Sequence, residues 1–542
     1  LSNNHRVYGE DIKYDSHGNM LVTGNFYADS IDCDPGIGNS FVKGNGKYDI
    51  FIAKYNSIGQ HIWSFAIGSN DDDFINALYV DKNDNVFVTG SYSGSLMNLD
   101  PKGNTCILGN QGSSDMFCAK YDSTGQIIWG YGFGGPSGQS GRDVVTDKND
   151  NVFITGVFFG SVDFDYGLGT VIKTSNGGYD VYLMKLKANG IFDSVITLGG
   201  VFDDQIWGID VDTSSNVYIG GNIGAGTATL HPVGSNTVSN NISGSNYLIA
   251  KYSNNLNYLW NACGTYPNGC SSSINRITID KLGTLHVTGV INGFGIDCDP
   301  GPGIKIINSN GGEDIFLASY KPNGELKQAA NVGGSGLDLG NGISSDQHGN
   351  IYNIGEYIGT LVDFDLSNNN YFLSSTNRDA YVVKYDSNYN FQFAFPIVGI
   401  FDANYGLAID ADTSGGFCIT GHLGWGAPDF DPTVQTYTLN GTFDAFVANY
   451  TKKAIIGIEE LLLSNESINL FPNPSSEYVF LKNFPNGEYF IYNSSGMLVQ
   501  KVKINSNLER ITLPQASSGT YFITNDAAKG YIGKKFIIQE KK

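Results

Sequence analysis

The stretch DKNDNVFVTG, residues 81–90, decides the fold because the chain repeats its pattern seven times. In each copy an acidic residue opens a polar turn, and an alternating apolar run that ends in Gly follows. A second pattern, DIFIAKY at 49–55, recurs with the same spacing. Two independent markers with one period indicate seven copies of one structural unit. The final glycines of the first pattern stand 65 to 68 residues apart, at Gly24, Gly90, Gly156, Gly221, Gly289, Gly355 and Gly421.

Each unit contains four short runs rich in Val, Ile, Phe and Tyr, which Gly, Asn, Asp and Ser separate. In the second unit these runs are 75–80, 85–89, 115–121 and 126–129, and we name them strands A, B, C and D in order. Their composition favours strands, and no repeat shows a sustained helical period. Seven such units arranged radially protect their edges. The sequence therefore predicts an all-β fold, a seven-bladed β-propeller over residues 1–450 with strands A around the axis.

The two ends of the repeat region do not match. The chain begins at strand A of the first unit, whereas the seventh C strand, at 444–450, precedes a segment without the D pattern. Only six D strands are therefore clear. We expect residues upstream of Leu1 to supply the seventh, or residues 451–463 to replace it. Because the chain starts at Leu1 without a signal peptide, we interpret it as a processed or trimmed form.

The repeat resembles the SBBP-type β-propeller repeat of secreted bacterial proteins, over about residues 1–450. The resemblance implies the fold and leaves the ligand open, since a propeller is a scaffold for many functions. The net charge of −21 argues against nucleic acid, whose phosphates require Lys and Arg. No apolar run is long enough for a membrane span.

After a linker at 451–467 the period ends, and a series of short alternating strands follows at 468–542. These strands, broken by Gly, Pro and Asn turns, predict a small β-sandwich. The segment resembles the type A sorting domain of the type IX secretion system, a pathway of Bacteroidota. The resemblance implies that the secretion machinery recognises this domain and exports the protein to the outer cell surface or the extracellular space. The matching residues are Pro472, Asn473, Pro474, Gly496, Gly519, Tyr521, Lys534 and Lys535.

Six of the seven cysteines fall into two groups. Four of them stand where other units carry Phe, Ile or Tyr, so we expect them to be buried as small apolar residues. Cys263 and Cys270 instead border a loop that only one unit has, and the sequence leaves open whether they form a local disulfide. The first group is Cys33, Cys118, Cys298 and Cys418.

The connection between strands B and C carries a recurring Asp-x-Asp pattern, best developed as Asp32 with Asp34 and Asp297 with Asp299. An extended Asp-x-Asp places both carboxylates on one face. Oxygen ligands without His or Cys favour Ca²⁺, the one cofactor that the sequence suggests. A Ca²⁺ site needs about six to eight oxygens, however. The alternative is a blade-building turn without metal.

The B–C and D–A connections should emerge on one face of the ring, where variable loops commonly bind ligands. Trp207 and Tyr405 lie near this face and could stack a sugar ring or pack in the core. The acidic candidates in the same connections are Asp72, Asp73, Asp203 and Asp204. We predict no catalytic residue, because no HExxH, G-x-S-x-G or zinc-spaced Cys pattern occurs.

We therefore expect a secreted or surface-attached propeller that binds a glycan or a surface protein with its loop-rich face, without catalysis. One alternative is an extracellular polysaccharide lyase or glycosidase, for which paired carboxylates would be needed on the same face. Another is a structural spacer.

Overall fold

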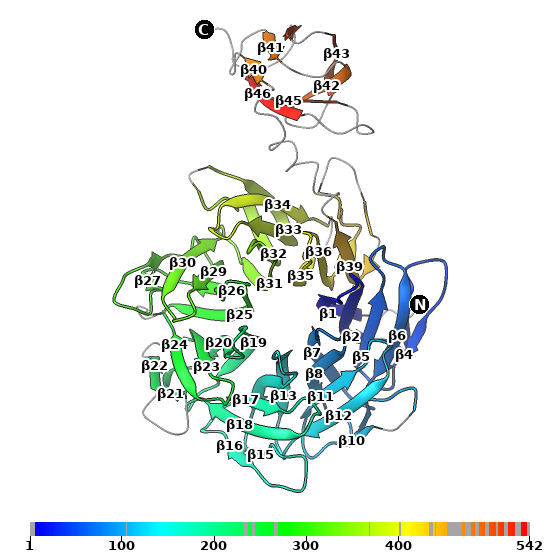
Figure 1. Cartoon of the computed structure of the whole chain (residues 1–542), viewed down its shortest axis with the longest axis vertical. Helices are drawn as coiled ribbons and strands as arrows, with labels where there is room; N and C mark the ends of the chain where they lie inside the picture. The colour runs from blue at the N-terminus through cyan, green and yellow to red at the C-terminus, as the bar shows by residue number, and fades with distance from the viewer. Residues whose placement is uncertain are drawn as a thin grey trace. The chain divides into compact units, whose positions relative to one another are not determined.

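The computed structural model divides the chain into two compact units, one of Leu1–Phe430 with Tyr437–Asn449, and one of Asp431–Thr436 with Tyr450–Lys542 (Figure 1). We treat each unit by itself. The residues described are 6–103, 106–230, 237–240, 244–264, 269–367, 369–399, 403–432, 437–439, 441–451, 469–471, 478–482, 487–493, 498–505, 508–513, 519–525 and 533–538.

The first unit is a ring of seven antiparallel sheets, which confirms the predicted seven-bladed β-propeller (Figure 1). Within each sheet the strands lie in the order A, B, C, D, and the A strands surround the axis. The A strands are β1 (Arg6–Tyr14), β7 (Asp73–Val80), β13 (Gln139–Thr146), β19 (Gln205–Val211), β25 (Ser271–Ile279), β31 (Leu339–Ser345) and β35 (Tyr405–Ala411). The B strands are β2 (Met20–Tyr27), β8 (Val86–Tyr92), β14 (Val152–Phe158), β20 (Val217–Ile223), β26 (Leu285–Asn292), β32 (Ile351–Asp363) and β36 (Phe417–His422).

The outer two strands complete six of the blades. The C strands are β5 (Asp49–Tyr55), β11 (Asp115–Tyr121), β17 (Asp180–Leu186), β23 (Asn246–Tyr252), β29 (Asp314–Tyr320), β33 (Phe372–Tyr385) and β39 (Ala445–Tyr450). The D strands are β6 (His61–Ile67), β12 (Ile127–Phe133), β18 (Phe192–Leu198), β24 (Tyr258–Ala262), β30 (Leu326–Val332) and β34 (Phe391–Ile397). Blade 7 has three strands among the described residues, β35, β36 and β39. Residues 452–468 lie outside the described part of the chain, so the source of a seventh D strand stays a prediction.

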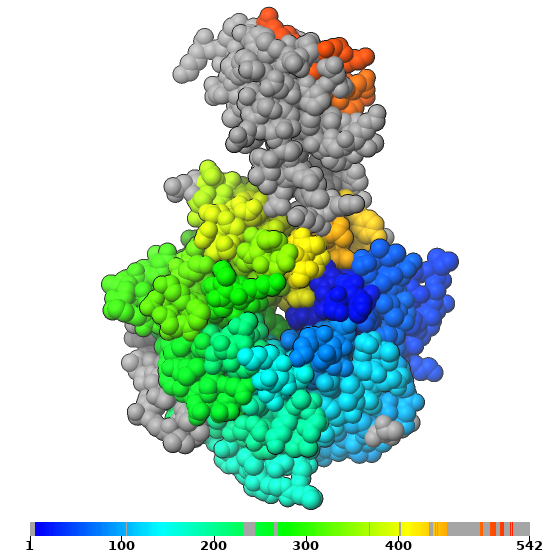
Figure 2. Space-filling model, viewed as in Figure 1, coloured from blue at the N-terminus to red at the C-terminus, as the bar shows by residue number. Residues whose placement is uncertain are grey.

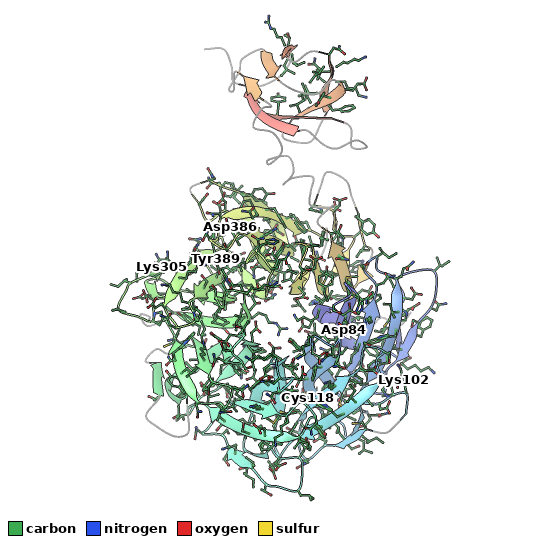
Figure 3. All side chains as sticks on the ribbon, in the orientation of Figure 1. Asp84, Lys102, Cys118, Lys305, Asp386 and Tyr389 are labelled. Carbon is green, nitrogen blue, oxygen red and sulfur yellow. The ribbon has the colours of Figure 1, made fainter. Side chains whose placement is uncertain are left out.

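An additional hairpin extends the B–C connection of most blades, a feature that the sequence did not predict. In blade 6 the long strands β32 and β33 extend through this region, and their register shifts at two places. Lys102 and Lys305, which lie in two of these connections, are at the outer rim of the ring (Figure 3). The hairpins pair β3 (Ser30–Asp32) with β4 (Phe41–Lys43), β9 (Leu96–Asn98) with β10 (Ile107–Gly109), β15 (Ser161–Asp163) with β16 (Ile172–Thr174), β21 (Gly226–Thr229) with β22 (Thr237–Asn240), β27 (Ile296–Asp297) with β28 (Ile306–Ile307), and β37 (Trp425–Gly426) with β38 (Gly441–Thr442).

The repeated pattern builds the A–B turn and the strand after it. The Asp81 carboxylate accepts hydrogen bonds from the backbone N–H groups of Asn83 and Asn85 at 2.8 and 2.9 Å. Asp84 takes a left-handed φ of 61°, which Asp tolerates in turns. The Thr89 hydroxyl then donates to the carbonyl of Phe117 on strand C at 2.7 Å. These contacts link three strands of one blade, so the pattern recurs wherever a blade does.

Neighbouring blades are joined near the axis by side chains that accept a hydrogen bond from the next blade's A strand. Asp11 accepts from the backbone N–H of Leu78 at 3.1 Å. Asp410 of blade 7 accepts from the N–H of Tyr14 in blade 1 at 2.9 Å, so the ring closes with the same contact. Apolar side chains from adjacent sheets fill the space between the blades. Among them, Cys118 is a buried free thiol, as expected (Figure 3).

The other cysteines are also free thiols. Cys33, Cys298 and Cys418 are buried in the way the sequence predicted. Cys263 packs against the hydrophobic core on one side of its loop, and Cys270 is buried in the core of blade 5. The possible disulfide between these two residues is therefore not formed in this structure.

The second unit contains two antiparallel sheets, of three and four strands. Buried apolar residues such as Ile491 and Ile523 form its core. Gly519 begins β45, Tyr521 on the same strand is buried, and Lys534 and Lys535 lie on β46. Pro472, Asn473, Pro474 and Gly496 lie outside the described residues. The strands are β40 (Asn469–Phe471), β41 (Tyr478–Lys482), β44 (Leu508–Thr512), β43 (Leu498–Ile504), β42 (Gly487–Asn493), β45 (Gly519–Asn525) and β46 (Gly533–Ile538).

Candidate ligand-binding site

A β-bulge interrupts every A strand at the same place. The register between strands A and B slips by one residue in all seven blades, between Gly9 and Asp11 in the first and between Gly141 and Asp143 in the third. A bulge re-aims a side chain, and bulges are common beside active sites. The extra residues, which we call the bulge ring, are Glu10, Asn76, Arg142, Trp207, Asn275, Asn341 and Leu407.

The bulge ring lines the central channel. All seven residues, together with Arg276, border a cavity of about 290 Å³. The space-filling view shows an opening at the centre of the ring, between the blades (Figure 2). We call the end of the channel near the D–A connections its upper end and the end near the A–B turns its lower end. Because strand A runs from the upper to the lower end, the bulge ring lies above the rest of the channel wall.

Three asparagines of the bulge ring have the same geometry. The Asn76 amide nitrogen donates to the carbonyl of Gly141 in the next blade at 2.7 Å. Asn275 and Asn341 donate in the same way, to Gly340 and Gly406, both at 3.0 Å. The amide nitrogens therefore tie neighbouring blades together. The amide oxygens of these asparagines have no hydrogen-bond partner among the described residues, so they remain as acceptors for a ligand.

Glu10 adds a carboxylate to the same wall. One of its oxygens accepts from the Asn25 amide at 3.0 Å. Burial in the channel raises the pKa of Glu10 to about 7, although the Asn25 amide and the charge of Arg276 oppose this shift. A carboxyl group that titrates near neutral pH in a cavity is a recognised feature of functional sites.

Arg142 and Trp207 form the other half of the wall. The guanidinium carbon of Arg142 lies 4.2 Å from the centre of the Trp207 ring, a cation–π contact between adjacent blades. The structure thus places the predicted candidate Trp207 at the channel. It leaves both Trp207 and Arg142 partly exposed there.

Below the bulge ring, a cavity of about 250 Å³ contains charged groups from several A strands. Arg276 bridges two carboxylates, with 3.3 Å to Asp11 and 3.3 Å to Asp143. Asp210 has no ion pair among the described residues, and burial raises its pKa to about 7, with Asp143 adding to the shift. Its oxygens accept from the backbone N–H groups of Val211 and Ile279, both at 2.7 Å. We therefore assign these lower carboxylates mainly to joining the blades.

Tyr405, the second aromatic candidate, is not among the residues that line the channel. It lies on β35, and its ring stacks on His422 with 4.3 Å between centroids and 20° between planes. His422 in turn meets Tyr8 of blade 1 edge-on at 4.7 Å. Tyr405 therefore belongs to an aromatic row that crosses the junction of blades 7 and 1.

The four acidic candidates divide by burial. Asp73 and Asp204 are buried, and both accept hydrogen bonds from backbone N–H groups, Asp204 from Gly200 at 2.7 Å. Asp203 is exposed and accepts from the N–H of Tyr179 at 2.9 Å. Asp72 is partly exposed, 3.7 Å from the Lys47 ammonium. These contacts show that the four aspartates stabilise the loops in which they lie. Their part in ligand binding stays a prediction.

The proposed Ca²⁺ residues form turns at the additional hairpins. Asp32 accepts from the N–H groups of Asp34 and Ser40 at 3.1 and 2.8 Å. Asp297 accepts in the same way from Asp299 at 3.1 Å. The turn interpretation accounts for these bonds without a metal. The Ca²⁺ interpretation stays a prediction, which thermal unfolding in millimolar Ca²⁺ and in chelator would test.

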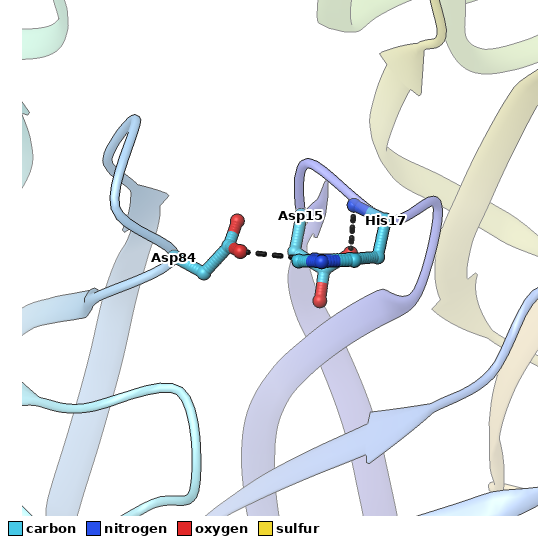
Figure 4. Close-up of side chains that lie close together, drawn as sticks. All are labelled: Asp15, His17 and Asp84. Atoms are coloured by element: carbon cyan, nitrogen blue, oxygen red, sulfur yellow. Dashed lines mark hydrogen bonds and ion pairs between the residues drawn. The ribbon is translucent and has the colours of Figure 1, made fainter.

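Asp15, His17 and Asp84 form one group of possible metal ligands, all within 4.8 Å of one another (Figure 4). The Lys54 ammonium lies 2.8 Å from Asp15, and the Ser16 hydroxyl donates to Asp84 at 2.9 Å. These neighbours already satisfy both carboxylates, and the group links the A–B turns of blades 1 and 2. We assign it a structural role.

Of the seven residues of the bulge ring, the sequence singled out Trp207 alone, and its part in ligand binding stays a prediction. The sequence placed Trp207 near a D–A connection, whereas β19 begins at Gln205 and includes Trp207. A signal was present, because the position after Gly9, Ile75 or Gly141 differs in chemical type from repeat to repeat. An inserted residue interrupts the alternation of inward and outward side chains along a strand, so the sequence pattern does not show which way this position faces.

Comparison with known protein families identifies the C-terminal segment. Residues 469–539 match the family described as "Secretion system C-terminal sorting domain". The C-terminal segment is a secretion sorting domain. The protein is therefore handled by type IX secretion and exported to the cell surface or the extracellular space. Among the described residues, no helix is long and apolar enough to cross a membrane.

One curated protein matches part of the chain. An uncharacterized WD repeat-containing protein, L264 of Acanthamoeba polyphaga mimivirus, is 26% identical over 220 residues, which are 37% of this chain and 15% of that protein. The chain thus spans a small part of that relative's length.

Two solved structures resemble the chain. One is a structural genomics protein of unknown function from Bacteroides thetaiotaomicron, at 12% identity and a TM-score of 0.27, covering 77% of this chain and 96% of the other. The second is PorZ, described as an essential bacterial surface component of the type-IX secretion system of Porphyromonas gingivalis. It is 9% identical, with a TM-score of 0.19 and coverage of 100% and 99%. At these TM-scores neither likeness carries an argument about function.

Proposed function

We propose that the protein is an exported binding protein without catalysis, which takes a glycan at the upper end of its channel. The observation that carries this proposal is the bulge ring. The fold requires a bulge at this place in each blade, yet the seven residues span acidic, basic, amide, aromatic and aliphatic types. Because the same bulge accommodates five chemical types of side chain, folding alone does not explain the set. A binding site that is built from unequal side chains does.

The chemistry of the wall suits a sugar. Trp207 offers an aromatic face that can pack on the C–H face of a pyranose ring, and aromatic walls with a few polar groups are typical of ligand sites. The free amide oxygens of Asn76, Asn275 and Asn341 can accept hydrogen bonds from sugar hydroxyls. We also propose that the repeats are of the SBBP type and that the source is a Bacteroidota bacterium, in keeping with the sorting domain.

A glycan array with the whole chain and two Trp variants tests this proposal. Trp207→Ala removes the stacking face, and we expect it to weaken binding about tenfold or more, as for a buried aromatic anchor. Trp425→Ala is the matched control, because Trp425 is 66% exposed on β37, in one of the additional hairpins. Equal binding by the wild type and Trp207→Ala, or a loss confined to Trp425→Ala, would contradict the proposed site. If the ligand is a protein instead of a glycan, no glycan on the array will be bound, whereas a surface protein will bind to the chain.

An extracellular glycan-active enzyme is the second candidate, and Glu10 is the observation that favours it. A carboxyl group with a pKa of about 7 suits a general acid. A glycosidase also needs a second carboxylate, and the neighbouring Asp11 is already paired with Lys13 and Arg276. Shortened products from a bound glycan, lost in Glu10→Gln, would support this candidate over simple binding.

A further inference from the structure

A third cavity opens beside the channel at its upper end. It holds about 290 Å³ between blades 2, 3 and 4. The described residues that line it include no carboxylate, although the whole chain carries a net charge of −21. Its polar lining consists of Ser91, Ser114, Gln139, Ser140, Tyr179 and Gln205, and Arg142 is its one charged residue.

Arg142 is half-buried and lacks the partners that such a cation normally has. Its Nε is buried without a hydrogen-bond partner, and it forms no ion pair among the described residues. Arg276 in the same channel is held by two carboxylates, and Arg378 on β33 lies 3.7 Å from Glu356. Burial lowers the pKa of Arg142, which reflects the cost of leaving its charge uncompensated. A buried charge is normally paired, so a negative group is the missing partner.

The neighbours of Arg142 are arranged as donors to such a group. The hydroxyls of Ser91, Ser114 and Tyr179 have no hydrogen-bond partner among the described residues. Tyr179 and Ser114 come from different blades, yet both hydroxyls lie close to Gly138, within 3.4 Å of where its Cβ would stand. The Trp207 ring packs against the guanidinium, whose carbon lies 4.2 Å from the ring centre. Hydroxyl donors around a planar guanidinium are the usual setting for a carboxylate or sulfate.

We propose that this pocket binds an oxyanion carried by the ligand, either the carboxylate of a uronic acid or a sulfate ester. Arg142 donates from its guanidinium to two oxygens of the anion, and the serine and tyrosine hydroxyls complete the shell. The inference rests on the proposed function in taking the ligand to be a glycan, and it makes that glycan acidic.

The other blades supply a matched variant. Asn stands at the position of Arg142 in blades 2, 5 and 6. Arg142→Asn should therefore fold and keep the melting temperature of the wild type or exceed it, since an uncompensated charge is removed. Arg142→Lys keeps the charge and loses the planar donor geometry. Arg378→Asn is the control, a change of the same kind outside the pocket.

Calorimetric titration of the whole chain with inorganic sulfate and with glucuronate tests the pocket without a glycan chain. We expect saturable binding of at least one probe by the wild type and by Arg378→Asn. Arg142→Asn should bind about tenfold more weakly or worse, with Arg142→Lys between them. The probe that binds more tightly identifies the anion. Failure of both probes to bind, or equal binding by Arg142→Asn, would overturn the inference.

The glycan array distinguishes a failure of the anion site from a failure of the proposed glycan binding. Binding of neutral glycans that Arg142→Asn leaves unchanged would contradict the anion site alone. Probe binding that depends on Arg142, together with an array on which no glycan is retained, would contradict the proposed function alone.

Discussion

The glycine that ends each copy of the repeated pattern lies against the bulge of strand A. A Cβ on Gly90 would stand 2.0 Å from the carbonyl oxygen of Phe74, and one on Gly156 would stand 2.1 Å from that of Ser140. No side chain fits at such a distance, so the backbone would have to move. The glycine therefore recurs because the bulge brings two backbones together, and the bulge is what directs a side chain into the channel.

Gly90→Ala should lower the free energy of unfolding by about 1–3 kcal/mol, the usual cost of overpacking. Chemical denaturation of the wild type and variant measures the change. Gly109→Ala is the control, because nothing lies within 4 Å of a Cβ at that position. A Gly90→Ala protein as stable as the Gly109→Ala protein would show that strand A can relax and that the bulge is not fixed by this contact.

Asp73 makes stability depend on pH. Burial raises its pKa to about 7, and the nearby Asp49 adds to the shift, whereas an Asp in the unfolded chain titrates near about 4. Between these values the folded ring holds a proton that the unfolded chain has lost. The contribution of Asp73 to the free energy of unfolding is therefore fully present below about pH 4. It disappears as the pH rises through about 7.

Asp73→Asn should reduce this pH dependence, since Asn cannot titrate. Blade 7 already carries Asn404 at the corresponding position, so the blade junction tolerates the amide. Melting temperatures of both proteins between pH 4 and 8 provide the measurement. A slope that is unchanged in Asp73→Asn would mean that Asp73 is ionised throughout this range.

Strands were more predictable than their departures from regularity. Strand C of blade 2, Asp115–Tyr121, has the bounds expected from its sequence, because a fully buried strand is a continuous apolar run. The additional hairpins have strands of two to four residues, too short to show a pattern. Arg142 was missed for a related reason: it follows Gly141 in a glycine-rich stretch, and only the register with β14 places it at the axis. Trp207 was found because its type alone marks it.

Hydrogen exchange at the outer edge of β39 can show which residues supply the fourth strand of blade 7. If residues 451–463 supply a fourth strand, removing residues 452–542 exposes the N–H groups of Ala445–Tyr450 to exchange. If that strand comes from residues upstream of Leu1, the same truncation changes nothing. We expect no change, because 451–463 lacks the D-strand pattern. Hydrogen exchange with mass spectrometry compares the two chains, with β33 as the internal reference. Faster exchange of β39 after truncation would assign the strand to the linker.

We expect the sorting domain and the ring to have separate tasks. The ring is a compact unit with its own core, and the sorting family covers residues 469–539. Deleting residues 468–542 should therefore leave a folded ring that stays within the cell envelope of a bacterium with type IX secretion. Fractionation and thermal unfolding of the retained protein measure both effects. Truncated protein in the medium, at the level of the full chain, would contradict the sorting role.

Stoichiometry tests most directly whether the ring binds an acidic glycan at its axis. A ring of seven similar blades has one axis and one Arg142 pocket, whereas sites on the Asp-x-Asp hairpins would occur in several blades. Titration calorimetry with an acidic oligosaccharide from the array gives the number of oligosaccharides bound per chain. The length of the recovered oligosaccharide then shows whether it has been cleaved. We predict one oligosaccharide per chain, recovered at its original length. Several per chain, none, or shortened products would contradict a single axial site that binds without catalysis.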